Sequence, residues 1–192
     1  MEDRAAHPRQ PSLRRLWARD ASSATTHTEC VIRTRQDYSV HVRIVLDSST
    51  LISLAWSAQL PLLARLPIEP VIINSVYAET VTEGHARGHA DAAGIEHALA
   101  ALTPAPDPEG RSVDAMVVSA AADVGALATN DVVIGRRAGN LGARWLRTGD
   151  LVLLGLATGS FDASAARRAI EALAVTGRIT PQLRDEFMED IA

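Results

Sequence analysis

Four acidic residues stand close to expected junctions between strands and helices. Two follow apolar runs typical of buried strands, and two lie about one turn into the helices that come later. The carboxyl ends of parallel strands share one edge of a sheet, and a helix that returns antiparallel begins near that edge. We therefore expect the four carboxylates to gather there. They are Asp47, Glu79, Asp114 and Asp131.

Carboxylates that lie close together repel one another unless a cation neutralises them. A set of hard oxygen ligands without Cys or His selects Mg²⁺ or Mn²⁺ over zinc. Water bound to such an ion can be ionised and directed at a phosphodiester, and a second ion can stabilise the leaving oxygen. The pattern therefore predicts a metal-dependent nuclease.

Each acid taken alone also has a purely structural interpretation. An Asp after a strand is often a helix cap, which would explain Asp47 or Asp131. Glu79 and Asp114 could each be solvated positions on a helix. The expected convergence of all four on one edge favours the functional interpretation.

The composition excludes several classes of enzyme. All 19 basic residues are arginine, which excludes phosphate-binding loops of the Walker type and Schiff-base enzymes, because both need a lysine. The single Cys30 excludes an internal disulfide and a cysteine-based metal cluster. Since no apolar run reaches the roughly 18 residues of a membrane span, we expect a cytoplasmic protein without a membrane segment.

Residues 1–41 differ from the rest of the chain. They hold seven Arg against five acids, whereas residues 42–192 hold twelve Arg against eighteen acids. We interpret residues 1–41 as a disordered basic extension, with a wrongly assigned start codon as the alternative. Residues 42–150 would form the catalytic core, and residues 151–192 a helical extension that packs on it.

Residues 42–192 read as alternating elements. β-branched runs predict strands, and the apolar spacing between them predicts helices, one of which Asn74 or Ser75 would cap. This alternation predicts an α/β fold: a parallel sheet of about four to five strands with helices on both faces, followed by C-terminal helices. Strands are expected at 42–46, 70–73, 126–129 and 143–147, and helices after 47 and at 60–66, around 76–80, 88–102, 113–123, around 136–138, 151–158, 163–175 and 181–189.

Four segments, in the family's order, resemble PIN-domain ribonucleases, and each carries one of the acids. A fifth segment, residues 177–183 (GRITPQL), resembles the C-terminal helices of a bacterial branch close to the VapC-type toxins. The four segments are residues 44–54 (IVLDSSTLISL), 71–79 (VIINSVYAE), 112–121 (SVDAMVVSAA) and 126–131 (ALATND).

The resemblance implies an endoribonuclease that cleaves RNA with Mg²⁺ or Mn²⁺, often paired with an antitoxin. Thr129 would add a hydroxyl to the site, and Ser48 would do likewise. Asn74 stands where the family usually has Pro, and Glu109-Gly110 reverses a pair usual before the third acid. The departures affect the loop before the third acid rather than the acids. The implied catalytic metal ligands are Asp47, Glu79, Asp114 and Asp131.

RNA is expected to bind through arginines that reach its phosphates, although solvated surface charge is an equally good interpretation of each one. The candidates are Arg136, Arg137, Arg144 and Arg147. The apolar faces of the first two helices predict a homodimer with Trp56 in or beside the contact. The first helix offers Leu51, Leu54, Ala55 and Ala58, and the second offers Leu60, Leu63, Leu66 and the neighbouring Pro61. The alternative function is a non-catalytic PIN-like module that binds RNA or a protein.

Overall fold

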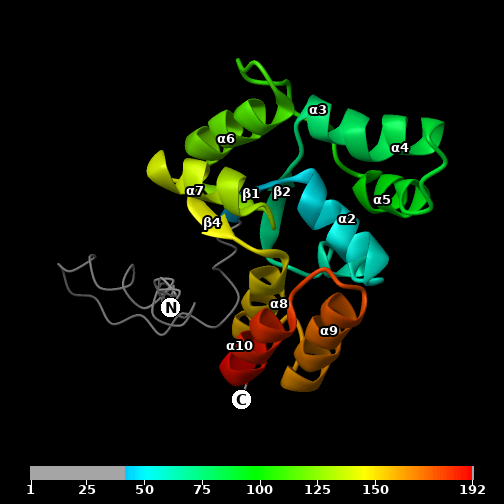
Figure 1. Ribbon diagram of the computed structural model, residues 1–192, viewed down its shortest axis with the longest axis vertical. Helices are drawn as coiled ribbons and strands as arrows, with labels where there is room; N and C mark the ends of the chain where they lie inside the picture. Colours follow the sequence, from blue (N-terminus) through cyan, green and yellow to red (C-terminus); the bar gives the residue numbers. More distant parts are fainter. Residues whose placement is uncertain (1–41, 192) are drawn as a thin grey trace, which may run out of the picture. The chain divides into compact units, whose positions relative to one another are not determined.

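The computed structural model describes residues 42–191, so the interpretation of residues 1–41 lies outside the described residues. Four parallel strands form one sheet in the order β2-β1-β3-β4. This confirms the predicted α/β fold with a parallel sheet and C-terminal helices (Figure 1). The strands are β1 (Val42–Leu46), β2 (Ile68–Val71), β3 (Ala126–Ala128) and β4 (Arg144–Leu146).

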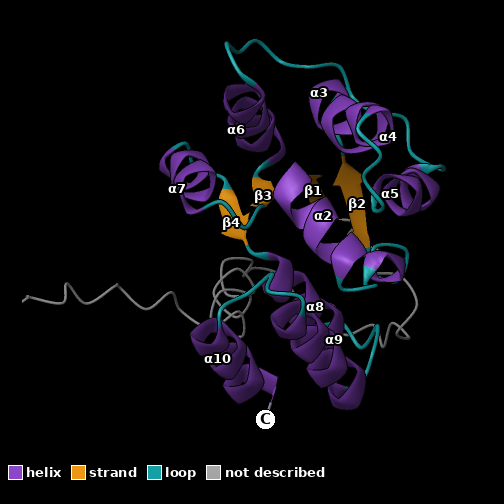
Figure 2. Cartoon of the chain, turned by 45° about the vertical axis from the view of Figure 1, so that its right-hand side comes forward, coloured by secondary structure: helices purple, strands orange, loops and turns teal. Residues whose placement is uncertain are grey.

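Helices connect and cover the strands (Figure 2). The chain runs from β1 outward to β2, returns to β3 and continues to β4 on the other side. Right-handed crossovers therefore place α2 on one face of the sheet, and α6 with α7 on the other. The helices are α2 (Ser48–Trp56), α3 (Asn74–Tyr77), α4 (Glu83–Ala86), α5 (Ala92–Leu99), α6 (Val113–Val124), α7 (Val132–Asn140), α8 (Thr148–Ala157), α9 (Ala163–Val175) and α10 (Pro181–Ile191), with a 3₁₀ turn η1 (Leu60–Leu62) and a π-helical turn η2 (Ala78–Thr82).

The two central strands carry the core. Val45, Leu46, Leu127 and Ala128 are all fully buried, as expected where helices cover both faces of a parallel sheet. The connections from β1 to β2 and from β3 to β4 run toward opposite edges of the sheet, so a topological switch point lies between β1 and β3. In open α/β sheets the crevice beyond the carboxyl ends of the strands at such a switch point is where ligands bind.

Several element boundaries differ from those expected. The helix expected at 60–66 is only the short turn η1, and β2 begins two residues before the expected strand. Pro70 lies within β2, which it can do because β2 is an edge strand. The alanine-rich helix is shorter than 88–102, because Gly88 takes a positive φ of 72° between α4 and α5.

The proline-rich segment at residues 104–108 is tied to the end of β2. Ala105 N–H donates to Ile72 O at 2.7 Å, and Asn74 N–H donates to Ala105 O at 2.9 Å. The Asp107 carboxylate accepts from the N–H and hydroxyl of Ser75 at 2.8 and 2.7 Å. The expected cap by Asn74 or Ser75 is therefore wrong, because Ile73 occupies the cap position and Asp107 receives the Ser75 N–H from outside the helix.

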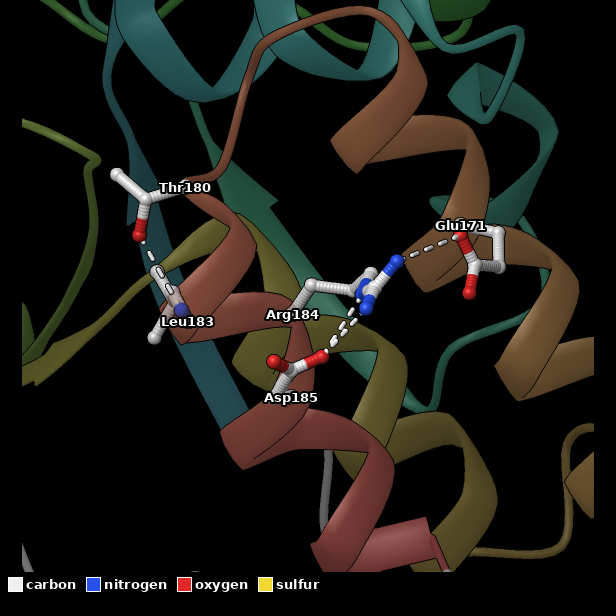
Figure 3. A network of polar contacts seen from close by, with 5 residues as sticks. All are labelled: Glu171, Thr180, Leu183, Arg184 and Asp185. Atoms are coloured by element: carbon white, nitrogen blue, oxygen red, sulfur yellow. Dashed lines mark hydrogen bonds and ion pairs between the residues drawn. The ribbon is translucent and has the colours of Figure 1, made fainter.

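The C-terminal helices pack against one another and against α2. Helix α8 begins at Thr148, so it crosses the boundary expected at residue 150. Figure 3 shows Arg184 of α10 between Asp185 of its own helix, at 2.6 Å, and Glu171 of α9, at 3.9 Å. No helix among residues 42–191 combines the length and the apolar character that crossing a bilayer requires.

Asp150 lies in the first turn of α8 and is half-buried. Burial raises the pKa of its carboxyl to about 6. Two effects of Arg147 lower the pKa: its N–H donates to Oδ2 at 2.7 Å, and its side chain is positively charged. The negative charge of Asp190 raises the pKa further. The folded protein therefore holds this proton more tightly than the unfolded chain, in which the pKa is 3.8. Protonated Asp150 therefore raises the free energy of unfolding. Its contribution is fully present below the unfolded pKa and is lost as the pH rises through the folded pKa.

Asp150→Asn removes this titration and keeps an acceptor for the Arg147 N–H. Relative to the wild type, the variant is expected to gain about 2–3 kcal/mol of unfolding free energy between about pH 4 and about pH 7. Denaturant unfolding of both proteins at a series of pH values measures this difference. A difference that does not change with pH would contradict the assignment.

Candidate functional site at the carboxyl edge of the sheet

Asp47 directly follows β1 at the switch point. Its side chain is only 5% exposed, and its backbone N–H donates to Ala128 O at 3.0 Å, which joins it to β3. The carboxylate does not cap α2. Instead, its Oδ2 accepts hydrogen bonds from the hydroxyls of Thr129 and Ser49, both at 2.7 Å. The helix-cap interpretation is therefore wrong for Asp47, whose carboxylate faces the end of the neighbouring strand.

Thr129 connects Asp47 to the loop after β3. Its hydroxyl is fully buried and accepts a hydrogen bond from Asp131 N–H at 3.0 Å. Ser49 similarly accepts from Asn130 N–H at 3.0 Å. A hydroxyl has a single proton to donate. Both hydroxyls donate to the same oxygen of Asp47, so the position of that oxygen is fixed from two sides.

The backbone of Thr129 is also held firmly. Its N–H donates to Leu146 O of β4 at 2.9 Å, and its carbonyl oxygen accepts from the indole Nε1 of Trp145 at 2.9 Å. A Cβ added to Gly135 of α7 would lie 2.2 Å from the Trp145 ring, so only glycine leaves room for the indole there. Trp145 thus supports the strand end that presents Thr129.

Glu79 reaches the same edge from the second crossover. It lies in the π-helical turn η2, and its exposed carboxylate accepts a hydrogen bond from the Ser48 hydroxyl at 2.6 Å. Ser48 is the neighbour of Asp47, so this contact brings Glu79 to the end of β1. A π-turn inserts one extra residue into a helix and changes the direction of its side chains, and such turns are frequent at functional sites.

Asp131 begins α7 and does act as its cap. Its Oδ1 accepts from the N–H groups of Val133 and Ile134 at 2.7 and 3.0 Å. The helix-cap interpretation therefore holds for this acid, which is exposed to solvent. Its own N–H donates to Thr129, so the cap and the Asp47 contacts belong to one network.

Asp114 is exposed in the first turn of α6, which the Ser112 hydroxyl caps through Ala115 N–H at 3.3 Å. Among residues 42–191, it forms no hydrogen bond with the other three acids. The structure thus joins Asp47 and Asp131 in one hydrogen-bonded system through Thr129, and it brings Glu79 to Ser48, the residue that follows Asp47. We call these residues together the edge network. Its residues are Asp47, Ser48, Ser49, Glu79, Thr129, Asn130 and Asp131.

The edge network offers oxygen ligands, the kind that Mg²⁺ and Mn²⁺ prefer. Neither Asp47 nor Glu79 forms an ion pair with a basic side chain in the described part of the chain. However, no three acidic, histidine or cysteine side chains of residues 42–191 lie together closely enough to hold a metal ion. The donor chemistry fits a hard cation, and the carboxylates are not gathered around one point.

Sequence reasoning missed two members of the edge network. Ser49 links Asp47 to β3, and Asn130 links β3 to two helices: its Nδ2 donates to Ser53 at 2.9 Å and its Oδ1 accepts from Thr148 N–H at 3.0 Å. Both are polar residues within two positions of recognised acids. Their partners are distant in sequence, so local pattern alone does not identify them.

The four candidate arginines are placed differently. Arg147 follows the carboxyl end of β4, with its guanidinium 5.4 Å from the Trp145 ring centre. Arg144 pairs with Ala126 at the opposite end of the strand, and Arg136 and Arg137 are exposed in the second turn of α7. Arg147 is therefore the candidate closest along the chain to the carboxyl edge of the sheet.

The apolar faces expected to form a dimer contact are largely internal. Leu51 and Leu54 are fully buried and Leu63 and Leu66 nearly so, whereas Trp56 is 56% exposed. A hollow of about 90 Å³ lies between the end of α2 and α9; Ala58 and Pro61 line part of it, and no residue of the edge network does. Most of the expected leucines are thus core residues, whereas Trp56, Ala58 and Pro61 are exposed.

No protein-family model matches the chain, and neither a curated protein nor a solved structure matches it.

Proposed function

We propose that this chain is a metal-dependent endoribonuclease and that the edge network is its site. The observation that carries the proposal is the position of Asp47. It is a buried carboxylate at the switch point of the sheet, where ligands of such folds bind. Its carboxylate accepts hydrogen bonds from two hydroxyl groups and forms no ion pair with a basic side chain among the described residues. A buried charge without a countercharge is costly, which favours a cation there.

Mg²⁺ or Mn²⁺ would be held by Asp47 with Glu79 and Asp131, and Asp114 is the fourth proposed ligand. Mg²⁺ keeps several waters and usually takes only one or two protein carboxylates, so it does not need three of them gathered in advance. When bound, the ion would supply an ionised water and stabilise the leaving oxygen of the phosphodiester.

The chain's own residues prepare the site. The hydroxyls of Thr129 and Ser49 fix one oxygen of Asp47, and Ser48 holds Glu79 beside it. The cap bonds fix Asp131 at the start of α7. Arg147 follows the neighbouring strand end, where its guanidinium would reach RNA phosphates; Arg136, Arg137 and Arg144 would contribute only to RNA that extends beyond the edge.

We also propose, with the resemblance as the only support, that the protein acts in the cytoplasm and pairs with an antitoxin. An arginine of such a partner would enter the acidic edge and compete with the metal. The homodimer also remains a proposal, with Trp56, Ala58 and Pro61 as the exposed residues of its expected contact. Co-expression with the neighbouring reading frame tests for the antitoxin.

The proposed activity is tested by incubating the purified full-length protein with total cellular RNA. Cleavage is expected with Mg²⁺ or Mn²⁺ and not with EDTA. Either ion should also raise the melting temperature of the metal-free protein, because a ligand that binds only the folded state stabilises it. Intact RNA together with an unchanged melting temperature would overturn the proposal.

The second candidate function is a PIN-like module that binds RNA or a protein without cleaving. One observation favours it: no three potential metal ligands of residues 42–191 are gathered together. A binding module would retain RNA in the presence of EDTA and leave it intact with either metal. The same incubation, followed by a gel-shift measurement, therefore separates the two functions.

A further inference from the structure

Trp56 and Arg178 form an exposed stack at the end of α2. The indole of Trp56 is 56% exposed, and the guanidinium carbon of Arg178 lies 4.7 Å from its ring centre. Arg178 lies in the connection between α9 and α10, where its N–H donates to Leu173 O at 2.8 Å and the neighbouring Ile179 is buried. These contacts fix the backbone position from which the Arg178 side chain reaches the ring.

The Arg178 guanidinium forms no ion pair with a carboxylate within residues 42–191. Its Nε is buried without a hydrogen-bond partner, so only the terminal nitrogens can contact a ligand. The terminal nitrogens of a guanidinium carry N–H donors in a planar fork that suits phosphate and carboxylate oxygens. The stack thus combines a largely exposed indole with an anion-binding group that no described side chain neutralises.

A partly exposed stripe of α2 connects this stack with the edge network. Ser49, Ile52 and Ala55 are half-buried and Trp56 is exposed, whereas Ser48, Thr50, Leu51, Ser53 and Leu54 are buried. The half-buried positions are three residues apart, so they share one face of the helix. At 1.5 Å per residue, the stripe from Ser49 to Trp56 is about 10 Å long, which a few nucleotides span.

We propose that the Trp56–Arg178 stack is a binding subsite for single-stranded RNA, with a base stacked on the indole and a phosphate on the guanidinium. Stacking on aromatic side chains and phosphate contacts from arginine are the usual means of holding single strands. The stripe favours RNA over an acidic peptide, because it leads from the subsite to the proposed cleavage site. This inference rests on the proposed function for the identity of its ligand.

The test uses full-length Asp47→Asn protein in EDTA, so that RNA is bound and not cleaved. The probe is a short, fluorescently labelled single-stranded RNA of mixed sequence, and its affinity is measured by fluorescence anisotropy. Trp56→Ala is expected to weaken binding at least about five-fold, which is the lower end of the effect of removing one stacking side chain. Arg178→Gln should weaken it as well, and Trp56→Phe should preserve most of it.

Arg87→Gln, directly after α4, is the matched control for charge, since Arg87 is exposed and pairs with Glu83 at 2.6 Å. It should bind RNA as tightly as its parent. Equal affinity of Trp56→Ala and its parent would overturn the inference. So would a Trp56→Ala protein that changes from dimer to monomer with unchanged RNA affinity, because Trp56 would then belong to a protein interface.

The two proposals fail separately. A wild-type protein that binds RNA through Trp56 and never cleaves it would support the subsite and overturn the nuclease. A metal-dependent nuclease whose affinity for RNA does not depend on Trp56 or Arg178 would overturn the subsite alone. The melting temperatures of Trp56→Ala and Trp56→Phe confirm that each variant is folded before its affinity is interpreted.

Discussion

Asp47→Asn is expected to lower the rate of RNA cleavage about 100-fold or more and to leave the fold intact. The amide has nearly the shape of the carboxylate, and its oxygen can accept the two hydrogen bonds that the Thr129 and Ser49 hydroxyls now donate to Oδ2. What is lost is the negative charge that a cation would bind. Because that charge is buried without a countercharge, the metal-free variant should be at least as stable as the wild type.

Cleavage of a defined RNA with saturating Mn²⁺ measures the loss, and thermal unfolding in EDTA measures the stability. Asp123→Asn is the matched control, because Asp123 is an exposed acid at the far end of α6. It removes the same charge from the chain and should cleave RNA at the wild-type rate. Full activity of Asp47→Asn would exclude Asp47 from the reaction, and equal losses in both variants would attribute the effect to total charge.

Gly149→Ala is expected to destabilise the protein strongly. Gly149 lies in α8, and an added Cβ would lie 2.2 Å from Cε2 and 2.4 Å from Cζ of Phe187. Phe187 and Ile191 are the buried residues of α10, and Phe187 is only 4% exposed. The ring must shift to make room for the added methyl group, which disturbs the packing of α10 on α8, so we expect a loss of about 1–3 kcal/mol in unfolding free energy.

Gly139→Ala in α7 is the control, since nothing lies within 4 Å of its added Cβ. It should stabilise the protein by up to about 1 kcal/mol through helix propensity. Phe187→Leu should restore part of the stability of Gly149→Ala, although alone it destabilises. Denaturant unfolding of the four proteins measures these effects. A Gly149→Ala protein as stable as the wild type would show that α10 is not packed on α8 through this contact.

The strand before Asp47 was predictable because residues 42–46, apart from Arg43, are β-branched or apolar and helical spacing begins immediately after them. The two acids at the strand ends illustrate what was not predictable. Asp47 and Asp131 follow similar local patterns, yet only Asp131 caps its helix. The difference arises because hydroxyls from Ser49 and a distant strand, at Thr129, hold the Asp47 carboxylate.

The position of Glu79 was also only partly predictable from the sequence. The pattern placed it about one turn into a helix after the second strand, and the structure places it near that position. The π-turn that carries it depends on packing against α2 and α5 rather than on local spacing. Ser49 and Asn130 belong to the edge network through a contact between residues 81 positions apart, which no short motif encodes.

The proline-rich segment beside β2 also bears on how the protein stays apart from other chains. An edge strand exposes N–H and C=O groups that another chain can pair with, and proteins often block this route to aggregation. Ala105 directs its N–H and C=O toward Ile72 and Asn74. In an extended segment the neighbouring residues point their polar groups the opposite way, and here both neighbours, Pro104 and Pro106, have no N–H to offer. The segment can therefore complete the edge at residues 72–74 without presenting donors on which a further strand could form.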